Sequence, residues 1–138
     1  MDCVFCKIIK GEIPSAKVYE NDKVIAFLDI HPVSQGHTLV VPKEHFENLL
    51  DGGEEILKEI MITIKKVAWA IVKTFDLKGF NVGQNNGRVA GQVVPHLHWH
   101  IMPRFPNDDL RLWPSGKYKG EEMGEIAKKI RKELENYK

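Results

Sequence analysis

The spacing of hydrophobic residues along this chain changes from a strand-like period to a helical one and back. Residues 18–30, VYENDKVIAFLDI, contain two runs rich in Val, Ile, Phe and Tyr around a polar turn at 21–23, which predicts two short strands. A further strand is predicted over Thr38–Val41, and Pro42 is expected to end it. Apolar residues at helical spacing then predict one long amphipathic helix from Glu54 to about Phe75.

The second half of the chain continues this pattern. Residues 79–87, GFNVGQNNG, begin as a strand and continue as a polar loop, and residues 96–104, HLHWHIMPR, predict a strand that ends at Pro103. Residues 104–120 contain prolines and glycines and predict an extended or looped segment. A last apolar stripe predicts a C-terminal helix: Met123, Ile126, Ala127, Ile130, Leu134 and Tyr137. Clustered strands without regular βαβ alternation predict an α+β fold with a mostly antiparallel sheet, in a single domain over 1–138.

Composition and charge narrow the classes of partner. The net charge is +1 and basic residues are interspersed with acidic ones, which argues against nucleic-acid or membrane-surface binding and favours a small-molecule partner. The N-terminal residues lack the apolar core of a signal peptide and no later run is long enough to span a bilayer, so a cytoplasmic protein is expected. In that reducing compartment the only two cysteines, Cys3 and Cys6, predict a metal site or a redox pair rather than a structural disulfide.

Three histidines within five residues are the densest chemical feature of the chain. On a strand, His96, His98 and His100 would share one face at about 6.6 Å intervals. The apolar residues that alternate with them would face the core: Leu97, Trp99 and Ile101. The outer two histidines would be roughly 13 Å apart, so three-fold ligation of one metal ion is difficult on a straight strand. The three imidazoles are therefore expected to divide their work.

Three interpretations of these histidines are open from the residues alone. They can be polar groups on a solvated strand face, metal ligands, or the parts of a nucleophilic site. An imidazole that attacks phosphorus needs one free nitrogen while the other donates its proton to a fixed acceptor. The preceding loop, QNNGRVAGQ, suits a phosphate because it offers glycines for close backbone approach and amide donors: Asn85, Asn86 and Gln92.

HLHWHIM fits the His-φ-His-φ-His-φ-φ signature, with φ apolar, and so resembles the histidine triad (HIT) family. The resemblance extends over CVFCKIIKGEIPSAKVYEND, VIAFLDIHPVSQGHTLVVPKEH and NNGRVAGQ, leaving only the C-terminal helix outside it. It implies a HIT-like fold, with a five-stranded, mostly antiparallel sheet, one long helix and a C-terminal helix. It also implies a nucleotidyl hydrolase or transferase that forms a covalent nucleotidyl-histidine intermediate, and a homodimer that joins two five-stranded sheets into one.

The resemblance also implies roles for individual residues. His98 would be the nucleophile, His100 would contact the α-phosphate, and Gln92 and Asn85 would orient phosphoryl oxygens. Asp29 matches the carboxylate that binds the ribose hydroxyls. The remaining nucleotide-binding positions are apolar: Val4, Phe5, Ile8, Phe27, Leu28, Ile30 and Val93.

Similar family members with this C-x-x-C hold a structural zinc ion with two histidines. The matching ligands are Cys3, Cys6, His45 and His96. Four protein ligands complete a tetrahedral zinc site, which leaves no open position for catalysis. The two remaining histidines, His31 and His37, are expected to be turn or strand-edge residues.

The branch of the family is less clearly marked. The phosphoramidase branch usually has Ser where Val93 stands, whereas the dinucleoside polyphosphate branch has Thr there and Gln in place of Asn85. LWPSG, at 112–116, resembles the phosphoramidase tail, which reaches the partner subunit's site. The predicted activity is cleavage of purine nucleoside 5′-phosphoramidates or related nucleotide conjugates. The alternatives are asymmetric hydrolysis of diadenosine tetraphosphate, a nucleotide-binding module with little catalysis, and a zinc-dependent catalyst with the three histidines as ligands.

Overall fold

The computed structural model describes residues 2–138, which form two compact units, one ending at Asp108 and the other spanning Asp109–Lys138. The second unit contains helix α3 (Glu122–Leu134), the predicted C-terminal helix, and none of its residues is buried. The expectation of a single domain over 1–138 stays a prediction. Among the described residues, no helix combines the length and the hydrophobicity that a membrane crossing requires.

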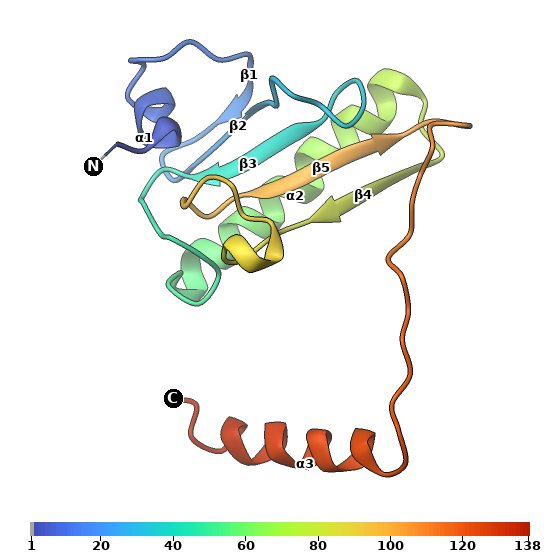
Figure 1. Ribbon diagram of the computed structural model, residues 1–138. Coiled ribbons are helices and arrows are strands. Elements are labelled where there is room, and N and C mark those ends of the chain that lie inside the picture. Colours follow the sequence, from blue (N-terminus) through green and yellow to red (C-terminus); the bar gives the residue numbers. More distant parts are fainter. Residues whose placement is uncertain (1) are drawn as a thin grey trace. The chain divides into compact units, whose positions relative to one another are not determined.

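The first unit is built around a five-stranded sheet in which all neighbouring strands are antiparallel (Figure 1). The strand order is β1-β2-β3-β5-β4. This confirms the predicted α+β fold with a five-stranded antiparallel sheet. The bounds of the strands are β1 Lys17–Glu20, β2 Val24–Leu28, β3 Thr38–Pro42, β4 Gly79–Gly83 and β5 Trp99–Arg104.

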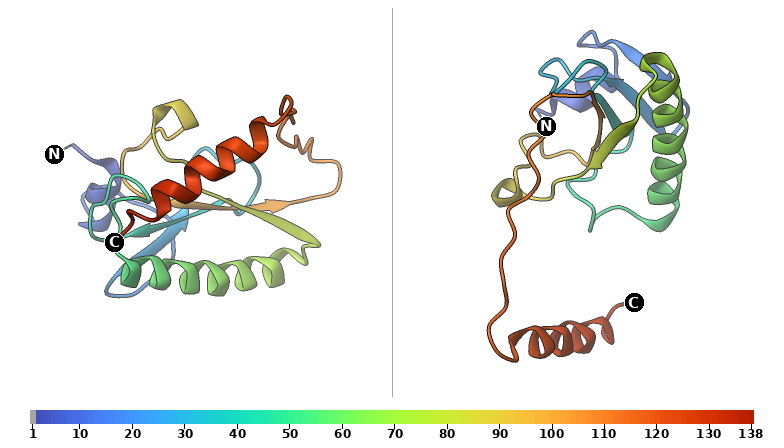
Figure 2. Two further views of the ribbon diagram at one scale, coloured as in Figure 1. Left: turned by 90° about the horizontal axis from the view of Figure 1, so that it is seen from below. Right: turned by 90° about the vertical axis from the view of Figure 1, so that its right-hand side faces the viewer.

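The two faces of the sheet are covered by different elements. Helix α2 (Glu54–Phe75), which has the predicted bounds, lies along one face, as Figure 2 shows, and buries Val24, Ala26 and Val40. On the other face, Phe5 of helix α1 (Val4–Ile9) packs with alternate residues of the central strands: Ile25, Phe27, Leu39 and Val41. Because both faces are buried, β2 and β3 have continuous apolar runs instead of alternation.

Three elements differ from the prediction, and the smallest is a 3₁₀ helix at Arg88–Ala90 inside the predicted polar loop. Helix α1 was not predicted, because six residues are too few to display a helical period. Strand β5 begins at Trp99 instead of residue 96, since the backbone before it bonds elsewhere: the Leu97 amide donates to the Phe46 carbonyl at 2.7 Å. The alternation of side chains nevertheless continues through this segment, and Leu97 and Trp99 lie in the α2 core as predicted.

Candidate active site

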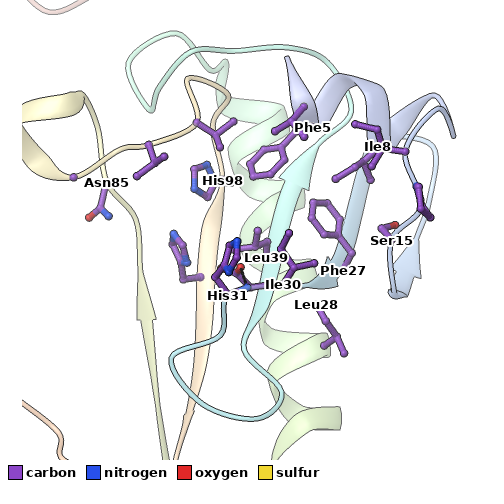
Figure 3. Close-up of a pocket in the computed structure, with 18 residues that line it drawn as sticks. Phe5, Ile8, Ser15, Phe27, Leu28, Ile30, His31, Leu39, Asn85 and His98 are labelled. Atoms are coloured by element: carbon purple, nitrogen blue, oxygen red, sulfur yellow. Dashed lines mark hydrogen bonds between the residues drawn. The ribbon is translucent and has the colours of Figure 1, made fainter. Parts of the chain in front are cut away.

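A cavity of about 410 Å³ opens on the α1 side of the sheet. Figure 3 shows Phe5, Ile8 and Phe27 at one end of it, and His98 and Asn85 at the other. With one exception, all the residues predicted to bind nucleotide line the cavity: Val4, Phe5, Ile8, Phe27, Leu28, Asp29, Ile30, Asn85, Val93, His98 and His100. The sequence did not single out several further lining residues: Ile13, Pro14, Ser15, His31, Leu39, Gly91 and Val94.

The exception is Gln92, whose side chain is buried and bonded to the backbone. Its Oε1 accepts from the Gly87 amide at 2.8 Å, and its Nε2 donates to the carbonyls of Glu47 at 2.7 Å and Val94 at 3.0 Å. Gln92 is absent from the cavity lining. The geometry therefore gives it the role of fixing the loop that carries Val93, and a direct contact of Gln92 with phosphoryl oxygens stays a prediction.

His98 is buried with one ring nitrogen held by the backbone. Its Nδ1 lies 2.7 Å from the carbonyl oxygen of His96, and because a carbonyl only accepts, Nδ1 carries the proton. Burial lowers the pKa of His98, which keeps the ring neutral at pH 7. A neutral ring protonated at Nδ1 has its lone pair on Nε2, so His98 meets the requirement for a nucleophile in the cavity.

His100 lies beside His98 and bonds to a histidine that the sequence did not single out. The rings of His98 and His100 have centroids 5.0 Å apart, and His37 Nε2 lies 2.8 Å from His100 Nδ1. Burial, with smaller contributions from His98 and His37, lowers the pKa of His100 to about 4. His37 follows a turn and directly precedes strand β3, as expected, but its side chain is buried and bonded to the site, which the sequence did not indicate.

The backbone around His37 explains its position. It follows Gly36, which has φ +88°, and a Cβ on this glycine would lie 2.7 Å from the ring of Phe75. The Asp29 amide donates to the His37 carbonyl at 2.9 Å, which brings Asp29 next to the histidines. Asp29 Oδ1 in turn accepts from the His31 amide at 2.9 Å, so the carboxylate is fixed at the cavity wall. A glycine followed by histidine before an apolar strand was the available indication of this site.

The first histidine of the triad lies in a separate cluster with both cysteines. The Cys3 Sγ, Cys6 Sγ, and ring nitrogens of His45 and His96 all lie within 4.8 Å of one another. Individual separations are 3.3 Å for Cys3 Sγ to His96 Nδ1, 3.4 Å for Cys6 Sγ to His45 Nδ1, and 3.0 Å between the two Nδ1 atoms. Tetrahedral zinc with sulfur and nitrogen ligands requires separations of about 3.3–3.8 Å. The cluster can therefore hold a metal ion with small adjustments.

Local hydrogen bonds position the side chains of this cluster. Cys3 is the N-cap of α1 and its sulfur accepts from the Cys6 amide, which places both thiols at the start of one helix. His96 Nε2 donates to the Pro42 carbonyl at 2.9 Å and leaves Nδ1 unprotonated for a metal ion. Burial raises the pKa of Cys6, with a further contribution from Cys3, so a metal ion would have to displace the proton of the Cys6 thiol.

Comparison with known proteins identifies relatives of this chain by sequence and by fold. The family model for the HIT domain matches residues 10–107 of this chain. A crystal structure of a HIT family member from Bacillus subtilis superposes with a TM-score of 0.89 at 46% identity and covers 96% of each chain. A Schizosaccharomyces pombe protein named adenosine 5′-monophosphoramidase hnt1 is 44% identical over 94% of this chain and 96% of its own length. The protein named adenylylsulfatase HINT3 from Arabidopsis thaliana is 43% identical over 83% of this chain and 57% of its own.

The resemblance drawn from HLHWHIM is thus confirmed by sequence and by fold. Two of the three histidines meet at one cavity and the third joins the cysteines, which is the division expected of the triad. The chain belongs to the histidine triad (HIT) domain family.

Proposed function

We propose that this chain hydrolyses purine nucleoside 5′-phosphoramidates or related nucleotide conjugates through a nucleotidyl-His98 intermediate. The observation that carries the proposal is the neutral His98 ring, with Nδ1 tied to the His96 carbonyl and Nε2 free at a nucleotide-sized cavity. Relatives named adenosine 5′-monophosphoramidase and adenylylsulfatase support a nucleotide hydrolase, since both names describe the release of a group from an adenylyl phosphorus.

The cavity suggests how the substrate would lie. Phe5, Ile8 and Phe27 would enclose the base at the apolar end, and Asp29 would bind the ribose hydroxyls. The phosphorus would then lie beside His98, with His100 donating to a phosphoryl oxygen. Attack by Nε2 forms a phosphorus–nitrogen bond as the bond to the leaving group breaks, and the departing amine takes up a proton from solvent. Water then attacks the phosphorus as the phosphorus–Nε2 bond breaks, and it loses a proton to solvent, which releases the nucleoside monophosphate and restores neutral His98.

The test is release of AMP from adenosine 5′-phosphoramidate and from diadenosine tetraphosphate by wild type and by His98→Ala. We expect faster turnover of the phosphoramidate, and loss of both reactions in the variant. Faster cleavage of diadenosine tetraphosphate would instead assign the protein to the dinucleoside polyphosphate branch of the family. Binding of AMP without cleavage of either compound would make it a nucleotide-binding module.

We further propose that the Cys3, Cys6, His45 and His96 cluster binds zinc in a structural role. Two thiolates and two imidazoles are an accepted tetrahedral zinc set, and a site with four protein ligands has no position for a substrate. One zinc ion per chain is expected by elemental analysis of protein purified without chelator. Turnover that persists after chelation, in protein that remains folded, would support the structural role, and loss of turnover without unfolding would contradict it.

We also propose that the protein forms a homodimer through strand β4. The sheet has two edges: β1 carries the charges of Lys17 and Glu20, whereas β4, GFNVG, carries none. Charged residues on an edge strand oppose pairing with another strand, so β4 is the edge suited to continue the sheet. Val82 on β4 and Val18 on β1 are similarly exposed, at 43% and 50%. In sedimentation experiments Val82→Lys should give a monomer and Val18→Lys should remain a dimer; the reverse would contradict the proposal.

A further inference from the structure

The His37 ring lies between a backbone donor and the ring of His100. The Val33 amide donates to His37 Nδ1 at 2.9 Å, and His37 Nε2 lies 2.8 Å from His100 Nδ1. His37 is only 3% exposed, so water is a poor substitute for either partner. Asp29 Oδ2 is 3.6 Å from His37 Nε2, longer than a hydrogen bond, so the short contact of Nε2 is with His100.

These contacts determine where the protons are. Because the Val33 amide is a donor, His37 Nδ1 must be the unprotonated nitrogen, and the neutral ring then carries its proton on Nε2. That proton is donated to His100 Nδ1, which must therefore accept. A neutral His100 that accepts at Nδ1 carries its own proton on Nε2. The reverse arrangement would place the Nδ1 proton of His37 against the Val33 amide proton.

We infer that His37 is a positioning residue that holds His100 in the tautomer protonated at Nε2, so that His100 donates a hydrogen bond to the substrate's phosphoryl oxygen. The inference rests on the proposed function and adds a residue to its machinery. His98 and His100, two residues apart, then have opposite tautomers. His98 has a lone pair on Nε2, whereas His100 has a proton on Nε2. An oxygen that gains negative charge in the transition state is stabilised by such a donor.

The same three side chains do not make a good metal site. Asp29, His37 and His100 place ligand atoms within 4.8 Å of one another, which is close enough for one ion. A metal ion on His37 Nε2 would move the ring proton to Nδ1, where the Val33 amide already points. The hydrogen-bond pattern therefore favours a proton over a metal ion between the two rings.

The tautomer assignment can be tested with the matched pair His37→Gln and His37→Glu. The two new side chains have nearly the same shape, but Gln has an NH₂ group where Glu has a carboxylate oxygen. The amide can donate to His100 Nδ1, whereas the carboxylate can only accept and requires a proton on that nitrogen. Nitrogen NMR of labelled histidine reports directly which nitrogen of His100 carries the proton. Turnover should be compared at a pH above the titration of His100 followed in the same spectra, with melting curves as the check on folding.

We expect wild type and His37→Gln to keep the His100 proton on Nε2, and His37→Glu to move it to Nδ1. The value of kcat should fall about 100-fold in His37→Glu and about three-fold in His37→Gln, while KM changes little in either. A wild-type His100 protonated on Nδ1, or equal kcat for the two folded variants, would overturn the inference. The NMR result does not depend on turnover, so a wild type that cleaves no nucleotide conjugate refutes the proposed function and leaves the tautomer assignment to the spectra.

Discussion

His96 and His98 are two residues apart, are both buried, and both bond to a backbone carbonyl, yet they serve different sites. In His96, Nε2 donates its hydrogen bond to the Pro42 carbonyl, and Nδ1 faces the thiols. In His98, Nδ1 donates its hydrogen bond to the His96 carbonyl, which leaves Nε2 for the cavity. The chemistry of each imidazole is therefore set by which of its two nitrogens is hydrogen-bonded to the backbone.

The largest effect that separates the two sites is expected for His98→Ala. Loss of the nucleophile should lower kcat by more than about 10⁴-fold and abolish the nucleotidylated protein seen by mass spectrometry after acid quenching. Metal content should equal that of wild type, since His98 lies outside the Cys3, Cys6, His45 and His96 cluster. If the variant lost both turnover and bound metal, the two sites would not be independent of each other.

Cys3→Ala should have the opposite pattern. The variant loses a metal ligand and the N-cap of α1, and we expect its free energy of unfolding to fall by about 4 kcal/mol when zinc exceeds its dissociation constant 100-fold. Urea unfolding with and without zinc measures this. Lys7→Ala, in the same helix with all four ligands intact, is the matched control. A kcat of folded Cys3→Ala as low as that of His98→Ala would show that the metal site takes part in chemistry.

The neutral state of the buried imidazoles predicts a loss of stability in acid. The pKa of His100 is about 4 in the folded protein against an ordinary value of 6.5. Between these values the unfolded chain binds the proton and the folded protein does not, so this stability is complete above pH 6.5 and lost as the pH falls toward 4. Between pH 7.5 and 4.5, wild type should lose about 2 kcal/mol more than His100→Asn, after allowance for partial exposure. Equal losses in urea unfolding would contradict this assignment.

The smallest effect is expected at the cavity wall. Val93 is 85% exposed, so Val93→Ser should change the free energy of unfolding by less than about 0.5 kcal/mol. The substitution introduces the serine that is usual in the phosphoramidase branch. Its hydroxyl can protonate a leaving amine. Turnover of adenosine 5′-phosphoramidate should rise several-fold, while turnover of diadenosine tetraphosphate and the metal content stay constant. An equal increase in turnover for both substrates would contradict the explanation that the hydroxyl protonates the leaving amine.

Sequence pattern predicted what depends on spacing along the chain. The helix over Glu54–Phe75 and the strands around it followed from periodicity, and the cavity lining followed from the resemblance to the family. The pattern did not indicate the contact of His37 with His100 or the bonds of the Gln92 side chain to the backbone. Both depend on backbone atoms that come near only after folding: the Val33 amide in one case and the Glu47 carbonyl in the other. Spacing shows which side chains share a face, but not which carbonyl or amide a ring or amide group will reach.

The hydrogen bonds of Gln92 have a consequence for the rate at which ligands bind. Its amide group bonds to three backbone positions, so the loop that carries Val93 and Val94 is fixed in the folded protein. That wall of the cavity does not have to be ordered by an arriving nucleotide. Association should therefore be a single fast step, with a rate constant that increases linearly with ligand concentration and shows no plateau from a slow loop closure.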